Sequence, residues 1–415
     1  MSPNPLPPEE NNFLSSKGKR NPRKQLNQLS KFFFNASNLI AILALAILLL
    51  TILNQAFTLT GTVDKVDRAT LISQPLEKLS KEELISLLQN NLTANRFKTL
   101  ERDRPLNDRN EEQLRELVES EVFKTSIVAT YNLFDALLHG KTLRAEILQE
   151  YPQARVEMRS WLNWAFITNT MAMKAEQSGV RTAILGSFFI ILIAILVGFP
   201  LGVSTAIYLE EYASKDSRLA RLIQTNIDNL AGVPSILYGI LGLAIFVRAM
   251  APLTSGSLFG LDATNSRTIL AAGLTMAMLI LPILITNSQE AIRAVPNSLR
   301  LASYGIGATQ WQTIWYHVLP SALSGILTGT ILAVSRGLGE TAPLIIVGAA
   351  TYITKDPSGL FSNFTALPIQ IYNWTTRPQT EYRSAAAAAI IVLLIMLLSI
   401  NAVAILWRNR IQKNH

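Results

Sequence analysis

The sequence predicts an all-α integral membrane protein with six transmembrane helices and a polar, helical insertion between the first two of them. Composition supports this class, because 49% of the 415 residues are hydrophobic and only 16% are charged, whereas soluble domains usually carry about 25% charge. Pattern supports it as well, because several apolar runs reach the roughly 20 residues that a helix needs to cross a bilayer core.

The charge and the side-chain inventory exclude other classes of protein. A net charge of +8 is compatible with nucleic acid or with an anionic membrane surface as a partner. The apolar runs favour the membrane, because no DNA-binding module requires them. The chain has no cysteine and three scattered histidines, so thiolate sites are excluded and a histidine metal cluster is not expected. We therefore expect contact with membrane lipid and no nucleic-acid partner, metal or cofactor.

Six apolar runs are long enough to be transmembrane helices. The third and fifth are less uniform, because Gly, Pro, Ser and a few charged residues interrupt them. Helices that line a path through a bundle have this composition, since small residues let neighbouring helices approach closely. The six runs cover residues 38–57, 181–207, 222–249, 268–286, 321–349 and 384–407.

The distribution of Lys and Arg predicts the orientation. Basic residues are concentrated in the N-terminal tail, near 208–221 and 287–320, and at the C-terminus. Because cytoplasmic loops carry the excess of Lys and Arg, both termini are expected in the cytoplasm. The polar tail, residues 1–36, is expected to be disordered. The first transmembrane helix, 37–57, is expected to be an uncleaved anchor, because no small-x-small cleavage site follows it.

The polar stretch 58–179 is long enough to be a small extracytoplasmic domain. Ser80 and Glu83 fit a capping box at the start of one helix, and a second helix is expected to begin near Asn110. Such a domain could be a docking surface for an extracytoplasmic partner or an elaboration that shields the bundle. We favour the second interpretation, because amphipathic helices alone specify no ligand. The membrane-spanning core is then expected to run from 180 to 415.

A two-helix element is expected in the segment 287–320, before the fifth run. Gly307 can supply a turn conformation that a side chain would penalise. Pro320, after Leu319, suits the first turn of the following helix, where its missing N–H costs nothing. The apolar side chains expected to hold this element down are Ile306, Trp311, Ile314 and Trp315.

Four strings of residues are distinctive, namely YLEEYA at 208–213, DNLAGVPSILYGILGLAIFV at 228–247, GATQWQTIW at 307–315 and GETAPLI at 339–345. The interval from Gly307 to Leu319 and Pro320 also matches the signature of ABC-importer permeases. From about residue 160 to the C-terminus, the chain resembles permeases of the phosphate-specific transport family (PstA type). Its insertion resembles the extra domain that a subset of this family carries.

This resemblance implies the ABC importer permease fold, in which two short helices outside the membrane dock onto an ATPase. The positions that it assigns to ATPase coupling are Ala302, Gly307, Trp311, Leu319 and Pro320. The sequence departs from the family's signature at two positions. Leu301 stands where the signature has an acidic residue, and His317 stands where it usually has Ile. Both departures concern the contact with the ATPase.

The resemblance also implies a set of partners: a sister permease, two ATP-binding cassette ATPase subunits and an extracytoplasmic phosphate-binding protein. The sequence agrees, because no G-x-x-x-x-G-K-[ST] loop is present to bind nucleotide phosphates. Nor is there a Ser/His/Asp or Cys/His constellation for covalent chemistry. We therefore expect a non-catalytic subunit of the bacterial inner membrane.

The fifth run contains two charged residues, Arg336 and Glu340, at a spacing that places them on one face of a helix. Ionisable residues inside a membrane cost about 2.5–3.5 kcal/mol at the helix centre and suggest function. Arg336 would offer a planar donor fork to phosphate, and Glu340 would hold Arg336 when the path is empty. The alternative is a structural pair that fixes helix packing. The predicted substrate path comprises Arg336, Glu340, Thr341, Pro343, Pro234 and Ser235.

Three other functions remain open at this point. A permease for another oxyanion, such as sulfate or molybdate, would share most of these features, and GETAPLI at 339–345 favours phosphate. A membrane receptor or signalling subunit would need a cytoplasmic output module, for which the cytoplasmic segments are too short. A secondary transporter would not need the element between Gly307 and Pro320.

Overall fold

The computed structural model describes residues 22–64, 66, 71–72, 74–123, 125–214, 216–261 and 265–413. The chain forms two compact units, which divide between Thr51 and Ile52. Helix α1 (Pro22–Ala56) begins in the first unit. Of the tail for which we expected disorder, residues 1–21 lie outside the described part, but the rest is helical. Pro22 suits the first turn of a helix, and apolar residues from Leu26 onwards continue the helix into the span.

Five helices among the described residues are long and apolar enough to cross a membrane, and a sixth crossing results only if one bent helix pair counts as a single span. The chain is thus a mostly helical, multi-pass membrane protein. The five helices are Lys31–Ala56, Arg181–Tyr212, Ile269–Arg293, Gln310–Gly339 and Thr380–Arg410.

The third predicted span, 222–249, corresponds to a bent helix pair and not to one continuous helix. The structure has α8 (Arg218–Ala231) and then α9 (Ser235–Gly242), which a π-helix extends to Ala249, and the two segments meet at 110°. Pro234 lies at the break. Its ring removes a backbone donor and disfavours helical geometry in the residue before it, so the chain turns there.

The fifth predicted span, 321–349, is also divided. Helix α14 (Leu319–Gly339) is followed by a short helix, α15 (Ala342–Val347). Between them Glu340 has an extended backbone, with ψ of 125°. Pro343 lies in the first turn of α15, where it cannot donate a hydrogen bond to the preceding turn, so it begins a new helix.

The insertion contains the expected helices. Ser80 and Glu83 form a capping box at the start of α2, and Asn110 forms one with Gln113 at the start of α4. It also contains a three-stranded antiparallel sheet of order β2-β1-β3, which the prediction of a wholly helical insertion missed. Its elements are β1 (Phe57–Val63), α2 (Lys81–Asn91), α3 (Ala94–Asp103), α4 (Glu111–Leu117), β2 (Ser126–Asn132), α5 (Leu133–Glu150), β3 (Arg155–Ser160) and α6 (Trp164–Thr168).

Strand β1 forms the centre of this sheet and follows α1 without a loop. Its residues are largely β-branched or aromatic, which favours a strand. Leu59 of this strand is buried. Thr58 pairs with Asn132 of β2 and with Arg159 of β3, so the sheet joins segments that are far apart in the sequence.

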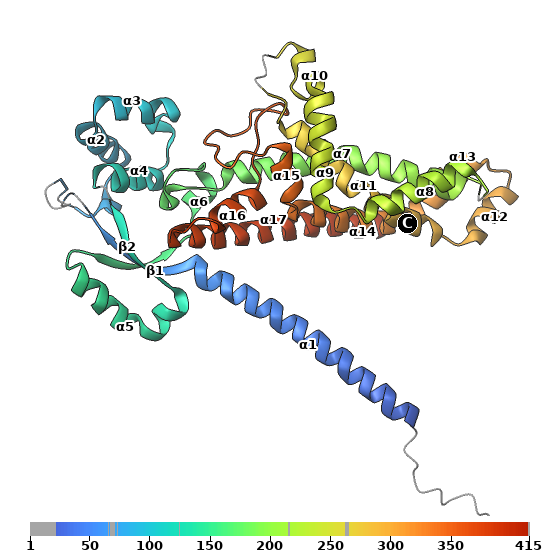
Figure 1. Ribbon diagram of the computed structural model, residues 1–415, viewed down its shortest axis with the longest axis horizontal. Coiled ribbons are helices and arrows are strands. Elements are labelled where there is room, and N and C mark those ends of the chain that lie inside the picture. The colour runs from blue at the N-terminus through green and yellow to red at the C-terminus, as the bar shows by residue number, and fades with distance from the viewer. Residues whose placement is uncertain are drawn as a thin grey trace, which may run out of the picture. The chain divides into compact units, whose positions relative to one another are not determined.

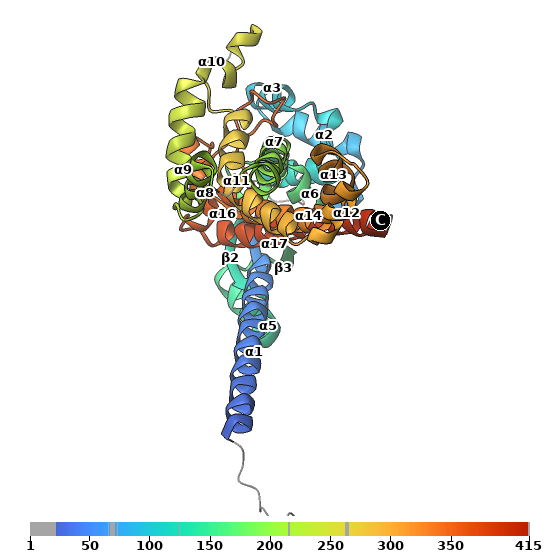
Figure 2. The same ribbon diagram turned by 90° about the vertical axis from the view of Figure 1, so that its right-hand side faces the viewer.

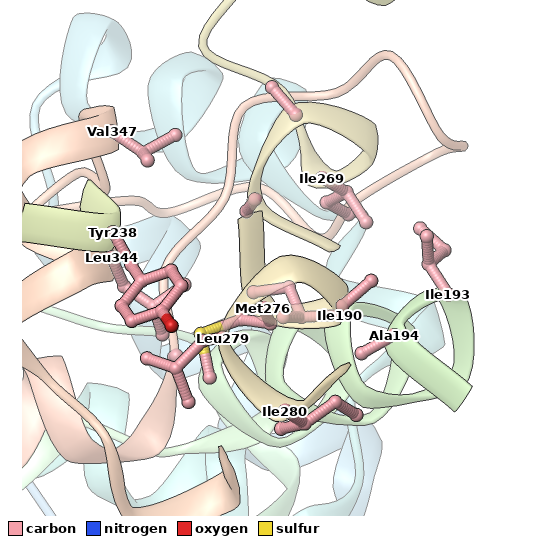
Figure 3. Packing of buried hydrophobic residues seen from close by; sticks show 14 of the residues in the cluster. Ile190, Ile193, Ala194, Tyr238, Ile269, Met276, Leu279, Ile280, Leu344 and Val347 are labelled. Atoms are coloured by element: carbon pink, nitrogen blue, oxygen red, sulfur yellow. The ribbon is translucent and has the colours of Figure 1, made fainter. Parts of the chain in front are cut away.

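Helix α11 forms the centre of the bundle. In Figure 2 it lies between α9 on one side and α7 and α14 on the other. Met276 and Ile280 of α11 pack in one cluster with Ile190 of α7, Tyr238 of α9 and Leu344 of α15 (Figure 3). The bundle elements not yet given are α7 (Arg181–Ile207), α10 (Ala251–Thr254), α11 (Ile269–Arg293), α12 (Asn297–Gly305), α13 (Gln310–Thr313), α16 (Leu367–Thr375) and α17 (Thr380–Lys413).

The insertion and the bundle share a hydrophobic cluster. We expected a boundary between residues 179 and 180, but Trp161 and Phe166 of the insertion pack with Trp374 of α16 and Ala385 of α17. The rings of Phe166 and Trp374 have their centroids 6.0 Å apart. The end of the insertion is therefore part of the core that supports the bundle, as the proximity of α6 to α16 and α17 in Figure 1 illustrates.

Candidate functional site

The predicted charge pair in the bundle is loose. Arg336 lies in the last turn of α14 and Glu340 just beyond its end. Arg336 Nε is 3.8 Å from Glu340 Oε1, and the two side chains are 54% and 21% exposed. Charge-assisted hydrogen bonds are much shorter, at about 2.7–2.9 Å. Arg336 donates no hydrogen bond to any residue that the structure describes, so its planar donor fork is available to a ligand.

The backbone that carries Arg336 is held on both sides. Ser335 Oγ donates a hydrogen bond of 2.8 Å to Asn401 Oδ1 of α17. Gly337 packs closely on α11, since a Cβ added there would lie 3.1 Å from Ile280 Cγ2. The Arg336 side chain thus projects from a fixed point of the helix.

The other predicted path residues lie on elements that adjoin one another. Glu340 and Thr341 occupy the break between α14 and α15, and Pro343 is buried in the first turn of α15. Helix α15 packs on α9, where a Cβ added to Gly239 would lie only 2.7 Å from Pro343 Cα. Ser235 begins α9, one turn before Gly239. The exposed Pro234 precedes it.

The loop between α11 and α14 contains the expected two short helices with a turn between them. Helices α12 and α13 are joined through Ser303 and Thr313, whose hydroxyl oxygens are 2.9 Å apart and buried. Gly307 has φ of +88°, the left-handed conformation that glycine adopts without a steric penalty. Its predicted role as the turn residue is confirmed in its geometry. Ala302, at the centre of α12, is exposed.

We expected the apolar side chains of this loop to pack against the bundle and hold the loop in place, but most of them do not. Of the expected set, Ile314 alone is buried, and Ile306 is 83% exposed. Trp311 and Trp315 are both at least half exposed and stack on each other, with ring centroids 5.4 Å apart. Adjacent turns of α13 and the following π-helix (Ile314–Val318) direct both indoles outward. They form an exposed apolar surface, which is typical of an interaction site.

Leu319 and Pro320 lie within a continuous helical stretch rather than at the start of a separate helix. The π-helix leads directly into α14, and Pro320 lies in its first turn. A π-helical turn bonds residues at a wider spacing than an α-helix. The local change in bonding accommodates a proline that has no N–H to donate.

Sequence reasoning missed a second charge pair, which anchors the same loop. Arg300 of α12 donates to Glu211 Oε1 through Nε at 3.1 Å and through Nη2 at 2.6 Å. It also donates to the carbonyl oxygens of Val295 and Ile292, at 2.7 and 3.0 Å. The Arg300 and Glu211 side chains are only 15% and 6% exposed. One guanidinium therefore ties the loop to the ends of α7 and α11.

A more exposed pair lies beside it. Arg293 Nη2, at the end of α11, is 2.5 Å from Glu210 Oε1, and the Arg293 side chain is 67% exposed. Gln310 Nε2 donates to the Glu211 backbone carbonyl, which adds α13 to the network. The glutamates of the YLEEYA string thus both bind arginines, a role that their spacing in the sequence does not reveal.

A cavity of about 290 Å³ lies in the insertion, lined by residues of the sheet, of the end of α4 and the segment after it, and of the stretch 174–177. Glu116 and Arg159 both line it. Burial raises the pKa of the Glu116 carboxyl to about 7, although the charge of Arg159 opposes the rise. None of the predicted path or docking residues lines this cavity.

Together these features define a multi-pass membrane transport subunit. It carries a loosely paired arginine in one of its long apolar helices and presents an anchored two-helix loop with exposed aromatic side chains. The comparison with known families gives the same class. The chain belongs to the family described as "Binding-protein-dependent transport system inner membrane component", which matches residues 198–413. The insertion lies outside the matched segment.

Several relatives are similar to the bundle. The probable ABC transporter permease protein YqgI of Bacillus subtilis is 31% identical over 52% of this chain and 73% of its own length. The phosphate transport system permease protein PstA of Haemophilus influenzae is 32% identical over 54% of this chain and 74% of its own length. PstA 1 of Mycobacterium tuberculosis (strain CDC 1551 / Oshkosh) is 36% identical over 48% of this chain, and the match spans 61% of its length.

Among solved structures, one with inward-facing conformations of the MetNI methionine ABC transporter is 18% identical to this chain. It covers 56% of this chain and 94% of its own, with a TM-score of 0.41.

Proposed function

We propose that this chain is the permease subunit of an ATP-driven phosphate importer and forms half of its translocation path. The observation that carries the proposal is Arg336, a half-exposed guanidinium on a fixed backbone with no short hydrogen bond among the described residues. The names of the relatives support phosphate as the substrate, since two of those described above are phosphate transport system permeases.

The chemistry of Arg336 suits a tetrahedral oxyanion. A guanidinium offers parallel N–H donors that match two oxygens of a phosphate, and it stays charged when water is removed. Glu340 lies close enough to attract Arg336, but too far to occupy its donors. An entering phosphate can therefore displace this weak contact, and the carboxylate can reclaim the arginine after the anion leaves.

The partners follow from the same proposal. The exposed Trp311 and Trp315 would enter a groove of a cytoplasmic ATPase subunit, which hydrolyses ATP, and Leu301 would add apolar contact where relatives of this type have an acidic residue. A sister permease completes the path, and an extracytoplasmic protein delivers phosphate. This arrangement places the chain in the bacterial inner membrane with both termini in the cytoplasm, as the excess of Lys and Arg indicates.

The test is transport by the assembled complex. This chain, its sister permease, the ATPase and the binding protein are reconstituted in proteoliposomes, and uptake of radiolabelled phosphate and sulfate is measured with and without ATP. We expect ATP-dependent uptake of phosphate that excess sulfate does not reduce. Equal uptake of both anions, or uptake of sulfate alone, would overturn the assignment of phosphate.

A further inference from the structure

The first turn of α5 (Leu133–Glu150) lies beside the C-terminal end of the apolar helix Lys31–Ala56. Helix α1 ends at Ala56 and β1 begins at the next residue. Because Thr58 near the start of β1 pairs with Asn132 at the end of β2, the end of β2 lies beside the start of β1. Helix α5 starts directly after Asn132. Figure 1 shows α5 beside the sheet formed by β1 and β2.

A hydrogen bond attaches the start of α5 to the end of the apolar helix. The backbone N–H of Phe134 donates to Asn54 Oδ1 at 2.7 Å. Asn54 belongs to the last turn of the apolar helix Lys31–Ala56. The start of α5 is therefore attached to the end of a membrane span and lies within one helical turn of its boundary.

Every side chain of Leu133–Leu138 except that of the exposed Asp135 is apolar, and three large apolar ones are exposed. Phe134, Leu137 and Leu138 are 43%, 70% and 77% exposed. Their spacing of i, i+3 and i+4 places them on one side of a helix. An exposed group of three large apolar side chains on one side of a helix marks a contact surface.

The helix changes character at His139, whose φ of −124° interrupts the helical geometry. After this kink the exposed residues include Lys141 and Arg144, and the helix is attached to the sheet. Ile147 is buried against Gly61 of β1, where an added Cβ would lie 2.8 Å from Ile147 Cγ2. The second part of α5 thus holds the first part in place.

We propose that the segment Leu133–Leu138 lies in the outer interface of the bilayer and contacts lipid. Two observations favour lipid as the occupant: the segment is continuous with a membrane span through β1 and Asn54, and cationic side chains follow it directly. Helices of this kind place apolar side chains at the boundary between headgroups and acyl chains, and Lys and Arg reach the phosphates beside them. The insertion is then held against the membrane by this segment as well as by the membrane helices at its two chain ends.

The absence of cysteine makes a direct measurement possible. A spin label is attached to Leu138→Cys in the assembled transporter in lipid nanodiscs, and its collision rates with oxygen and with a neutral nickel chelate are compared. Thr142→Cys, at an exposed position after the kink, is the matched control. We expect the oxygen-to-nickel ratio to be about tenfold higher at position 138, because lipid dissolves oxygen and excludes the polar chelate.

Two other results would overturn the proposal. A ratio at position 138 as low as that of a label in water would mean that the leucine faces water. Low accessibility to both reagents at position 138 would mean that a protein subunit covers this surface. Phosphate uptake by the same labelled complex is measured in parallel, so that a failure of the lipid contact is distinguished from a failure of transport.

Discussion

Two arginine–glutamate pairs of this molecule differ in every respect that determines their role. Arg300 and Glu211 are buried, share two short hydrogen bonds and satisfy backbone carbonyls as well. Arg336 and Glu340 are 3.8 Å apart, and the arginine is half exposed. A fully engaged pair can only hold structure, whereas a loosely held cation can bind an anion. The geometry gives the first pair an anchoring role, and the proposed function gives the second pair contact with phosphate.

The largest effect is expected from breaking the anchored pair. Arg300→Gln leaves the Glu211 carboxylate buried without its cation, which costs about 3–5 kcal/mol. Lower thermal stability of the purified protein and weaker recovery of the ATPase in a pull-down would measure this loss. Arg293→Gln is the matched control, because its exposed pair with Glu210 contributes at most about 1 kcal/mol. Equal effects of both variants would remove the distinction between buried and exposed pairs.

Removal of the loosely held cation should affect transport and leave assembly intact. Arg336→Gln replaces the charge with a neutral amide and should lower phosphate uptake about a hundredfold, since hydrogen bonds to charged groups contribute about 1.5–3 kcal/mol each. Arg336→Lys should recover part of the activity, because it keeps the charge and loses the fork. Uptake is measured with the yield of the purified complex. A lower yield without a specific loss of uptake would mean that this pair is structural too.

A third arrangement sharpens the comparison. The half-buried Glu116 carboxylate accepts a hydrogen bond of 3.2 Å from Asn169 Nδ2 and makes no ion pair within 4 Å among the described residues. Its pKa is raised from 4.5 to about 7, so the protonated form is favoured in the folded state. This contribution to stability is complete below pH 4.5 and is lost as the pH rises through 7. Between pH 5 and 8, the melting temperature of the unsubstituted protein should fall more than that of Glu116→Gln. The difference between the two corresponds to up to about 2 kcal/mol in the free energy of unfolding. An unchanged pH profile would contradict the assignment.

The loop that Arg300 anchors offers a smaller perturbation. At Gly307, φ of +88° would cost a β-branched residue about 1–2 kcal/mol, and nothing lies near enough for its side chain to clash. Gly307→Val should therefore distort the turn and weaken both ATPase recovery and uptake, while the bundle remains folded. Gly305→Ala, on the adjacent helix and in open space, is the control and should be neutral. Normal uptake in Gly307→Val would exclude the loop as the element that transmits motion.

Local sequence patterns predicted much of the fold and one of the two arginine–glutamate pairs compared above, Arg336 with Glu340. Arg336 was recognisable because an ionisable residue stands out in an apolar run, and Gly307 because few residues fit a tight turn. Glu211 and Arg300 were not recognisable as a pair, since they are 89 residues apart and only the packing of α7 against α11 brings them together.

The sheet was missed for a similar reason. Strand β1 follows a membrane helix directly, and its partners, Asn132 and Arg159 opposite Thr58, are too distant in sequence for a hairpin pattern. Pro234 was a local signal for a break in the helix, but the largely apolar character of the residues after it led us to predict a single span over 222–249.

The measurement that tests the central claim most directly is phosphate uptake by the charge-swapped double variant Arg336→Glu/Glu340→Arg. This exchange keeps an attractive pair but moves the cation beyond the end of α14, into the extended segment that precedes α15. Our account predicts a complex that assembles with normal yield and takes up no phosphate, since the donor fork no longer projects from its fixed position. Recovery of uptake in this variant would contradict the account, because only a structural pair tolerates exchange of its partners.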